Sequence, residues 1–265
     1  MTGEVAYNAA ALHDRFRDLA EIRAFARKLI AQWDRADNLP FEMKTEYIQG
    51  GGPMIWSYAK HSIELMRTVL DLSEQNRMVI AIPLIRLVTE NAMTSIWLYL
   101  EPGNARAMVH EGFRQRRAAL QDILQTGVEG FDTSHVDDAN RVLDDFADAD
   151  LPAGRHFDQR CKEIVGGFNV YCSWRVMSSY SHAGMAMGDF YLFETAEAPG
   201  IGFNKGAVMD YHEAWLGTAV CMMIAAMKTC NEIDGKGRLR AQIERAMSRM
   251  NIGVELRSTR DGVVA

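Results

Sequence analysis

The feature that most constrains the fold is the segment MVIAIPLIRLVTENAMTSIWLYL at 78–100, the longest apolar run in the chain. A helix of about 20 apolar residues is long enough to cross a lipid bilayer. This run, however, contains Arg86, Glu90 and Asn91, and such groups are costly inside a membrane span. The run therefore predicts a buried helix of a soluble bundle, and we expect no membrane partner.

The rest of the chain also favours helices. Proline is scarce, with 6 residues, and methionine is abundant, with 16. Apolar residues recur at spacings of three and four in several segments, as they do on one face of an amphipathic helix. We therefore predict an all-α fold, a single-domain bundle of about eight helices. The domain should span 1–252, with a long glycine-rich loop near 184–206 and a frayed C-terminal tail at 253–265.

Cysteine usage and the N-terminus indicate where the protein works. The four cysteines are Cys161, Cys172, Cys221 and Cys230. None belongs to a C-x-x-C pair and most lie in apolar helical context, which is typical of reduced, buried thiols. The first residues lack a basic stretch followed by an apolar core, so they do not resemble a signal peptide. These features predict a cytoplasmic protein.

The sequence WRVMSSYSHAG at 174–184 carries the sharpest chemical clue. On a helix with 100° per residue, Arg175 and His182 point within about 20° of each other. Tyr171, Ser178 and Ser179 fall near the same line, whereas apolar residues occupy the opposite side. An imidazole can give and take protons, and a guanidinium can stabilise charge on a phosphoryl oxygen. Without a metal, that pair suits attack of a ribose 2′-hydroxyl on its own phosphate.

Two structural alternatives compete with this interpretation. Arg175 could pair with a carboxylate of a neighbouring helix, and His182 could bond a backbone carbonyl. Arg86 and Glu90, which are i,i+4 neighbours, could form a buried ion pair that only stabilises the fold. In the functional interpretation, the 78–100 helix packs beside the 168–182 helix, and Glu90 orients Arg175 or His182.

A binding protein is the second functional hypothesis. The tryptophans Trp56, Trp97, Trp174 and Trp215 could line an internal pocket, with Arg86 and Arg175 holding the carboxylate or phosphate of a small, partly apolar ligand. Ordinary core packing of each tryptophan is the alternative. A third hypothesis is a structural or partner-binding protein, a homodimer through an apolar helix face.

Metal and nucleotide cofactors are not expected. His61 and Glu64 have helical i,i+3 spacing, but no Glu-x-x-His repeat of a di-iron bundle occurs. Phosphate-binding glycine motifs are also absent. The net charge of −6 argues against a broad nucleic-acid surface, although a local groove could draw on the run FRQRRAAL at 113–120.

Three pieces of the sequence together resemble a known family. They are PLIRLVTENAMTSIWLYLEP at 83–102, the arginine-rich helix after it, and YCSWRVMSSYSHAG at 171–184. Over about 50–190 the chain resembles a bacterial domain-of-unknown-function family of all-helical proteins. The Arg-x6-His spacing is also similar to the signature of HEPN domains. That resemblance implies a metal-independent ribonuclease of toxin or phage-defence systems, with RNA as substrate, Arg175 and His182 as the catalytic pair, and a homodimer as the working form.

Overall fold

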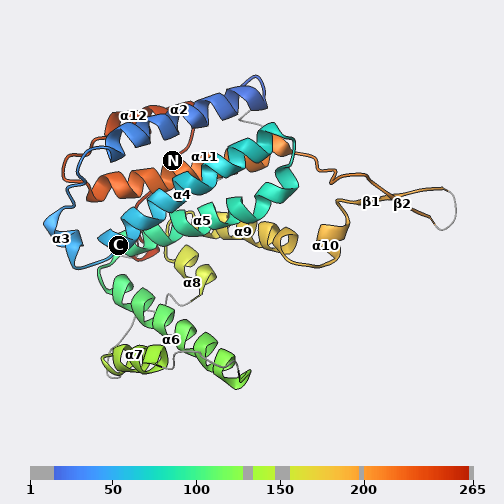
Figure 1. Cartoon of the computed structure of the whole chain (residues 1–265). Coiled ribbons are helices and arrows are strands. Elements are labelled where there is room, and N and C mark those ends of the chain that lie inside the picture. The colour runs from blue at the N-terminus through green and yellow to red at the C-terminus, as the bar shows by residue number, and fades with distance from the viewer. Residues whose placement is uncertain (1–14, 128–133, 147–155, 197–199, 263–265) are drawn as a thin grey trace.

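The computed structural model describes residues 15–127, 134–146, 156–196 and 200–262. Within these ranges the chain is all-α, as predicted, and a two-stranded hairpin is the one sheet (Figure 1). Its long helices are α2 (Leu19–Asp37), α4 (Gly52–Glu74), α5 (Met78–Leu100), α6 (Gly103–Gln125), α9 (Gly167–Ser181) and α11 (His212–Ile233). Its shorter helices are α3 (Thr45–Ile48), α7 (Ser134–Asp144), α8 (Phe157–Lys162), α10 (Met185–Gly188) and α12 (Arg240–Met250). The described ranges thus hold eleven α-helices where about eight were expected, because short helices such as α3 and α10 lack a periodic apolar pattern.

The core is built around α4, α5 and α11, which pack against one another along their lengths (Figure 1). α2 and α12 cover this group on one side, while α8 and α9 lie against α5 on the other. Most residues of α5 are buried, and its fully buried side chains include Ile82, Ile85 and Trp97. α5 is the one helix of the described residues that is long and apolar enough to cross a membrane, with 67% of its most apolar window buried inside the protein.

The ends of several helices follow from local sequence. The Asp18 carboxylate accepts a hydrogen bond of 2.9 Å from the Glu21 amide and so caps the first turn of α2. Pro53 lies at the start of α4, where a backbone N–H would have no acceptor within the helix, so the lack of this group in proline costs nothing. Asn251 ends α12 in the left-handed conformation, with φ of 54°. These local signals mark the start of α2, the start of α4 and the end of α12.

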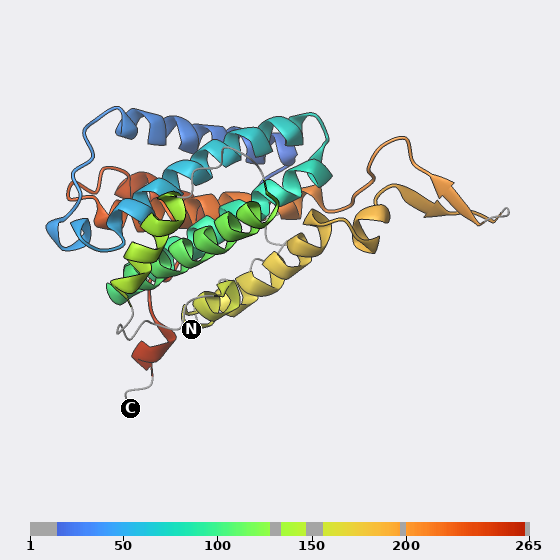
Figure 2. The same ribbon diagram turned by 60° about the horizontal axis from the view of Figure 1, so that its bottom comes forward.

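α6 and α7 form a separate pair on the outside of the bundle (Figure 2). The start of α6 is tied to the core because the Asn104 side chain donates a 2.6 Å hydrogen bond to the carbonyl of Trp97. Beyond its first turns α6 is mostly exposed, including Ile123 and Leu124 near its end.

The glycine-rich stretch predicted as a loop near 184–206 holds α10 and a hairpin. β1 (Leu192–Glu194) pairs with β2 (Ile201–Phe203) in antiparallel register, with Leu192 opposite Phe203. We call the described part of 185–211 the arm. The hairpin projects away from the helices (Figures 1 and 2). The root of the arm is anchored by aromatic contacts, since the Tyr180 ring lies 4.9 Å from Phe190 and 6.3 Å from Trp215 between centroids.

The described part of the C-terminal segment makes backbone hydrogen bonds to the turn after α8. We expected 253–265 to fray, but the described part of this segment packs beside α8 and α9. The amide of Val165 donates to the carbonyl of Arg257 at 3.1 Å, and the amide of Thr259 donates to the carbonyl of Glu163 at 3.0 Å. These backbone bonds and the buried side chain of Val254 order the segment up to 262. Residues 263–265 lie outside the described residues.

Candidate functional site

α9 presents three different sides, and they separate the residues that the sequence grouped together. Val170 and Met177 are buried against the core. Tyr171, Trp174 and Ser178 are half-buried and lie toward α5 and α8. Arg175, Ser179 and His182 are exposed to solvent. The predicted polar stripe is therefore divided, because the helix is rotated so that Tyr171 and Trp174 are partly covered by α5 and α8.

The half-buried side of α9 meets a charged pair of α5. The Arg86 guanidinium lies 2.8 Å from Oε1 of Glu90, with side chains 22% and 27% exposed. The same Oε1 accepts a 2.8 Å hydrogen bond from the Trp174 indole N–H. Nε of Arg86 donates to Oγ of Ser178 at 2.9 Å, and the guanidinium lies 4.6 Å from the centroid of the Trp174 ring. These contacts hold α9 to α5 through polar groups satisfied at the interface.

Aromatic rings complete this interface on the side of α8. The Trp174 ring stacks on Tyr171 at 5.8 Å between centroids with an interplanar angle of 20°. Phe157 of α8 packs on Trp174 at 4.8 Å. Tyr171 was predicted on the polar stripe and Trp174 in a ligand pocket; in the structure both rings make these intramolecular contacts.

Glu90 does not have the orienting role proposed for it. We expected its carboxylate to position Arg175 or His182, and its hydrogen-bond and ion-pair partners in the described residues are Arg86 and Trp174. Arg86 is likewise committed to Glu90 and Ser178, so its guanidinium is not directed at a ligand. The interpretation of Arg86 and Glu90 as a structural ion pair therefore accounts for their geometry.

Arg175 and His182 are both accessible. α9 ends at Ser181, and His182 follows it in extended conformation, with φ of −118° and ψ of 151°. The imidazole thus leaves the helical line that the spacing assumed, although it remains at the exposed end of the same helix. Within the described residues neither side chain makes a hydrogen bond or an ion pair. The guanidinium and the imidazole are both open to a molecule from outside.

The remaining predicted residues have local roles. Ser178 donates to the carbonyl of Trp174 at 3.0 Å, and Ser179 donates to the carbonyl of Val176 at 2.7 Å. Trp97 is fully buried, and its indole N–H donates to Glu163 at 2.8 Å. Trp97 and Trp174 therefore fill separate parts of the α5 interface rather than one shared cavity.

A half-buried arginine next to Trp97 was not foreseen from the sequence. Arg160 of α8 donates to Oγ1 of Thr94 at 3.2 Å and lies 5.4 Å from the centroid of the Trp97 ring. Burial lowers the pKa of Arg160 from its ordinary value. Arg86, Glu90 and Thr94 follow one another along α5 at intervals of four residues. This spacing of polar residues in an apolar helix is the signal in the sequence for polar contacts along one side of α5. The partner of Thr94 on α8, 66 residues away, has no such signal.

The described residues contain no group of three or more His, Cys, Asp or Glu side chains that could hold a metal ion. Comparisons of the chain with protein-family models, with curated proteins and with solved structures find no match. The function must therefore be inferred from the side chains themselves.

Proposed function

We propose that the chain is a HEPN-like, metal-independent endoribonuclease of the cytoplasm, of the toxin or phage-defence type, that works as a homodimer. The observation that carries this proposal is the open position of Arg175 and His182. Both are exposed at the C-terminal end of α9 and have no hydrogen-bonded or ionic partner among the described residues. A guanidinium on α9 and an imidazole directly after its last turn, both open to solvent, suit contact with a charged substrate.

The proposed reaction is a transesterification within the RNA chain. The ribose 2′-oxygen attacks the adjacent phosphorus, and its proton passes to an imidazole that acts as general base. The bond between phosphorus and the 5′-oxygen breaks, and that oxygen takes a proton from a general acid. The products are a 2′,3′-cyclic phosphate and a 5′-hydroxyl. Arg175 stabilises the negative charge that builds on the phosphoryl oxygens in the transition state.

The need for both a base and an acid favours a dimer. Each chain supplies one imidazole at the end of α9, and a second copy supplies another. The arm starts three residues after His182 and carries many exposed apolar side chains, such as Met185 and Phe203. In this proposal, the partner contacts the start of the arm, which follows His182 directly in the chain. Two copies arranged about a two-fold axis can then bring their α9 ends to one RNA strand.

The test is cleavage of a single-stranded RNA of mixed sequence in the presence of EDTA. We expect the wild-type protein to leave cyclic phosphate ends, and Arg175→Ala and His182→Ala each to lower the rate by about 100-fold or more, as removal of a charge-stabilising or acid–base group does. Because both side chains are exposed, the melting temperature should not change.

Matched controls are Arg245→Ala and His61→Ala, which remove exposed side chains from α12 and α4. Both controls should cleave at the wild-type rate. The proposal fails if wild-type protein does not cut RNA, or if either Arg175→Ala or His182→Ala cuts it at an undiminished rate.

A further inference from the structure

A cleft lies where the turn between α4 and α5, the start of α11 and the root of the arm come together, at the end of the bundle from which the arm projects (Figure 1). Its volume is about 300 Å³, at the lower end of the range for small-molecule sites. Residues 76–80 line one part of it. The rest is lined by Tyr191, Gly206, Ala207, Met209 and His212. The cleft is thus built from segments that are far apart in the chain.

Backbone hydrogen bonds hold both parts of the cleft in place. The amide of Arg77 donates to the carbonyl of Leu72 at 2.8 Å, and Asn76 between them turns the chain with a left-handed φ of 56°. In the root of the arm, the amide of Asn204 donates to the carbonyl of Tyr191 at 2.8 Å. The turn before α5 and the root of the arm are therefore ordered segments on which a site can be built.

Two side chains that can carry positive charge line the cleft, Arg77 and His212. Arg77 is exposed and His212 is half-buried. Among the residues that the structure describes, neither side chain makes a hydrogen bond or an ion pair. None of the described residues that line the cleft is an aspartate or a glutamate. The cleft therefore offers hydrogen-bond donors to an anion, and no carboxylate of its own walls competes for them.

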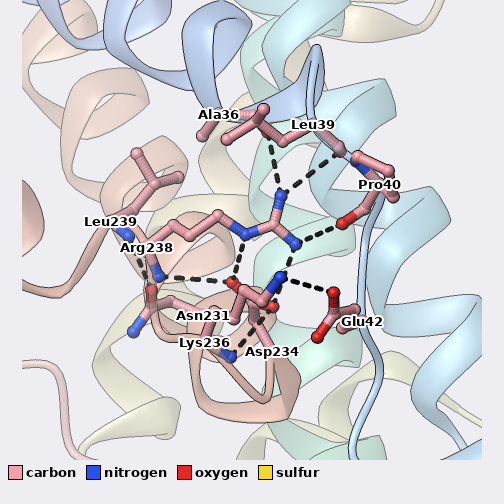
Figure 3. A network of polar contacts seen from close by, with 9 residues as sticks. All are labelled: Ala36, Leu39, Pro40, Glu42, Asn231, Asp234, Lys236, Arg238 and Leu239. Atoms are coloured by element: carbon pink, nitrogen blue, oxygen red, sulfur yellow. Dashed lines mark hydrogen bonds and ion pairs between the residues drawn. The ribbon is translucent and has the colours of Figure 1, made fainter.

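An arginine with a structural role is arranged differently, as Arg238 shows (Figure 3). The Arg238 guanidinium donates to the carbonyls of Ala36 and Leu39 at 3.2 Å and to that of Pro40 at 2.6 Å. These bonds tie the chain after α2 to the turn between α11 and α12. The guanidinium of Arg77 makes no such bond within the described part of the chain, so its N–H groups can form a bidentate contact with a phosphate.

Two helices begin at the cleft and add to its positive potential. α5 starts at Met78 and α11 starts at His212, and no side chain caps either start. The first backbone N–H groups of a helix have no acceptor within it and favour a nearby anion. Glu213, in the first turn of α11, is not among the residues that line the cleft. The helix starts thus act in the same direction as the side chains of Arg77 and His212.

The remaining walls of the cleft are mainly apolar. Ile80, Tyr191 and Met209 line it, and the side chains of Ile80 and Tyr191 are 45% and 37% exposed. Burial of this apolar surface by a ligand is favourable. A ligand that fits the cleft therefore has an anionic group at one end and an apolar body at the other.

We propose that this cleft binds a small organic phosphate, a phosphomonoester on an apolar body. The phosphate accepts hydrogen bonds from the Arg77 guanidinium and from an imidazole N–H of His212, and the body packs on Ile80 and Tyr191. A phosphate is favoured over a carboxylate because its three free oxygens and its higher charge match two donor side chains from different segments. This site is independent of the ribonuclease proposed above.

Titration calorimetry with phenyl phosphate as the probe tests the proposal. The comparison compounds are inorganic phosphate, which lacks the apolar body, 3-phenylpropanoate, which carries a carboxylate, and benzyl alcohol, which is uncharged. We expect phenyl phosphate to bind at least about fivefold more tightly than each of them. Its affinity should fall with added salt. Equal or tighter binding of any comparison compound, or no binding of phenyl phosphate, would overturn the proposal.

Substitution of the two donors tests where the phosphate binds. Arg77→Gln should weaken the binding of phenyl phosphate by about tenfold and His212→Ala by about threefold, because charge-assisted hydrogen bonds to the phosphate are lost. Arg245→Gln removes another exposed arginine, on α12 and outside the cleft, and should leave the affinity unchanged. Equal affinities of the Arg77→Gln and Arg245→Gln variants would contradict the proposed site.

Gly206 permits a matched pair of variants within the cleft. It lines the cleft, and a Cβ atom at this position would have no heavy atom within 4 Å. Gly206→Asn and Gly206→Asp can therefore both be accommodated, and they differ by one charge. Gly206→Asp should bind phenyl phosphate at least about fivefold more weakly than Gly206→Asn, because the added carboxylate repels the phosphate. Equal affinities of these two variants would show that the phosphate does not enter the cleft.

Discussion

At the scale of single residues, Glu90 shows how a charged group is accommodated in a very apolar helix. Its carboxylate sits where α5 meets α9 and accepts bonds from Arg86 and Trp174. Removing one partner of such a cluster leaves the other groups partly desolvated and unpaired. The residue is therefore important for stability even though it does not contact Arg175 or His182.

We expect Glu90→Gln to lower the free energy of unfolding by about 1–2 kcal/mol, because the charge-assisted bonds to Arg86 and Trp174 are lost at a partly buried interface. Urea titration measures this change. Glu64→Gln is the matched control on α4. Its carboxylate is 61% exposed and lies 3.5 Å from Arg67, so the change should stay within about 0.5 kcal/mol. Equal effects of the two substitutions would contradict the structural role of Glu90.

The cysteines give a second prediction at this scale. Burial raises the pKa of Cys161 and of Cys221 to about 12. Cys230 is buried as well, while Cys172 on α9 is exposed. Because the thiolate is the reactive form, Cys172 should react rapidly with a disulfide reagent at pH 8 in the native protein, and the other three only after unfolding. Cys172→Ser should abolish the rapid phase. A second rapid thiol in the native protein would contradict this assignment.

At the scale of elements, the turn between α8 and α9 is set by a close approach of backbones. Gly166 adopts φ of 75°, a left-handed conformation that favours glycine. A Cβ atom on the next residue, Gly167, would lie 2.2 Å from the carbonyl oxygen of Cys161 and 3.0 Å from Met93. The first turn of α9 can therefore pack against α8 and α5 only without a side chain at this position.

Gly167→Ala should destabilise the protein by about 3 kcal/mol, because the backbone of α8 must move to admit the methyl group. Thermal unfolding measures the loss. Gly112→Ala is the control: this glycine lies within α6 and has open space around its Cβ position. There the substitution should stabilise the protein by about 0.5–1 kcal/mol, since alanine favours the helix. A harmless Gly167→Ala would show that the α8–α9 contact is looser than described.

At the scale of the whole molecule, the arm is notable because it leaves many large apolar side chains exposed to solvent. Half of the exposed large apolar side chains among the described residues belong to it: Met185, Tyr191, Leu192, Phe193, Ile201, Phe203, Val208 and Tyr211. Phe193 covers Gly202 across the hairpin, but no described helix packs on the strands. An isolated two-stranded hairpin is only marginally stable in water. These features favour burial of the arm against a second copy.

We expect light scattering to give twice the chain mass of 29.8 kDa for the wild-type protein. Phe203→Glu replaces the highly exposed aromatic side chain at the end of β2 with a charge and should shift the protein to monomer. The same variant should lose RNA cleavage, because the second imidazole is no longer supplied. Ile123→Glu, an exposed apolar position of α6, is the control and should remain dimeric and active. A monomeric wild-type protein would remove the dimer from the proposed mechanism.

The sequence by itself determined the all-α class, the buried helix at 78–100 and the contact between Arg86 and Glu90. These are local features, since the apolar period and the i,i+4 neighbourhood follow from helix geometry alone. Only the tertiary structure decided how α9 is rotated. The sequence placed Tyr171 and Ser178 on one open face with Arg175, yet the packed helix turns both toward its neighbours.

The tertiary structure alone also decided which residues of different helices contact each other. Trp174 meets Glu90 from 84 residues away, and Arg238 meets Pro40 from 198 residues away. No local pattern in the chain encodes such pairs, because they depend on the sum of packing over all the helices. The packed orientation of α9 buries Val170 and Met177 and partly covers Trp174, and those contacts exist only in the folded chain.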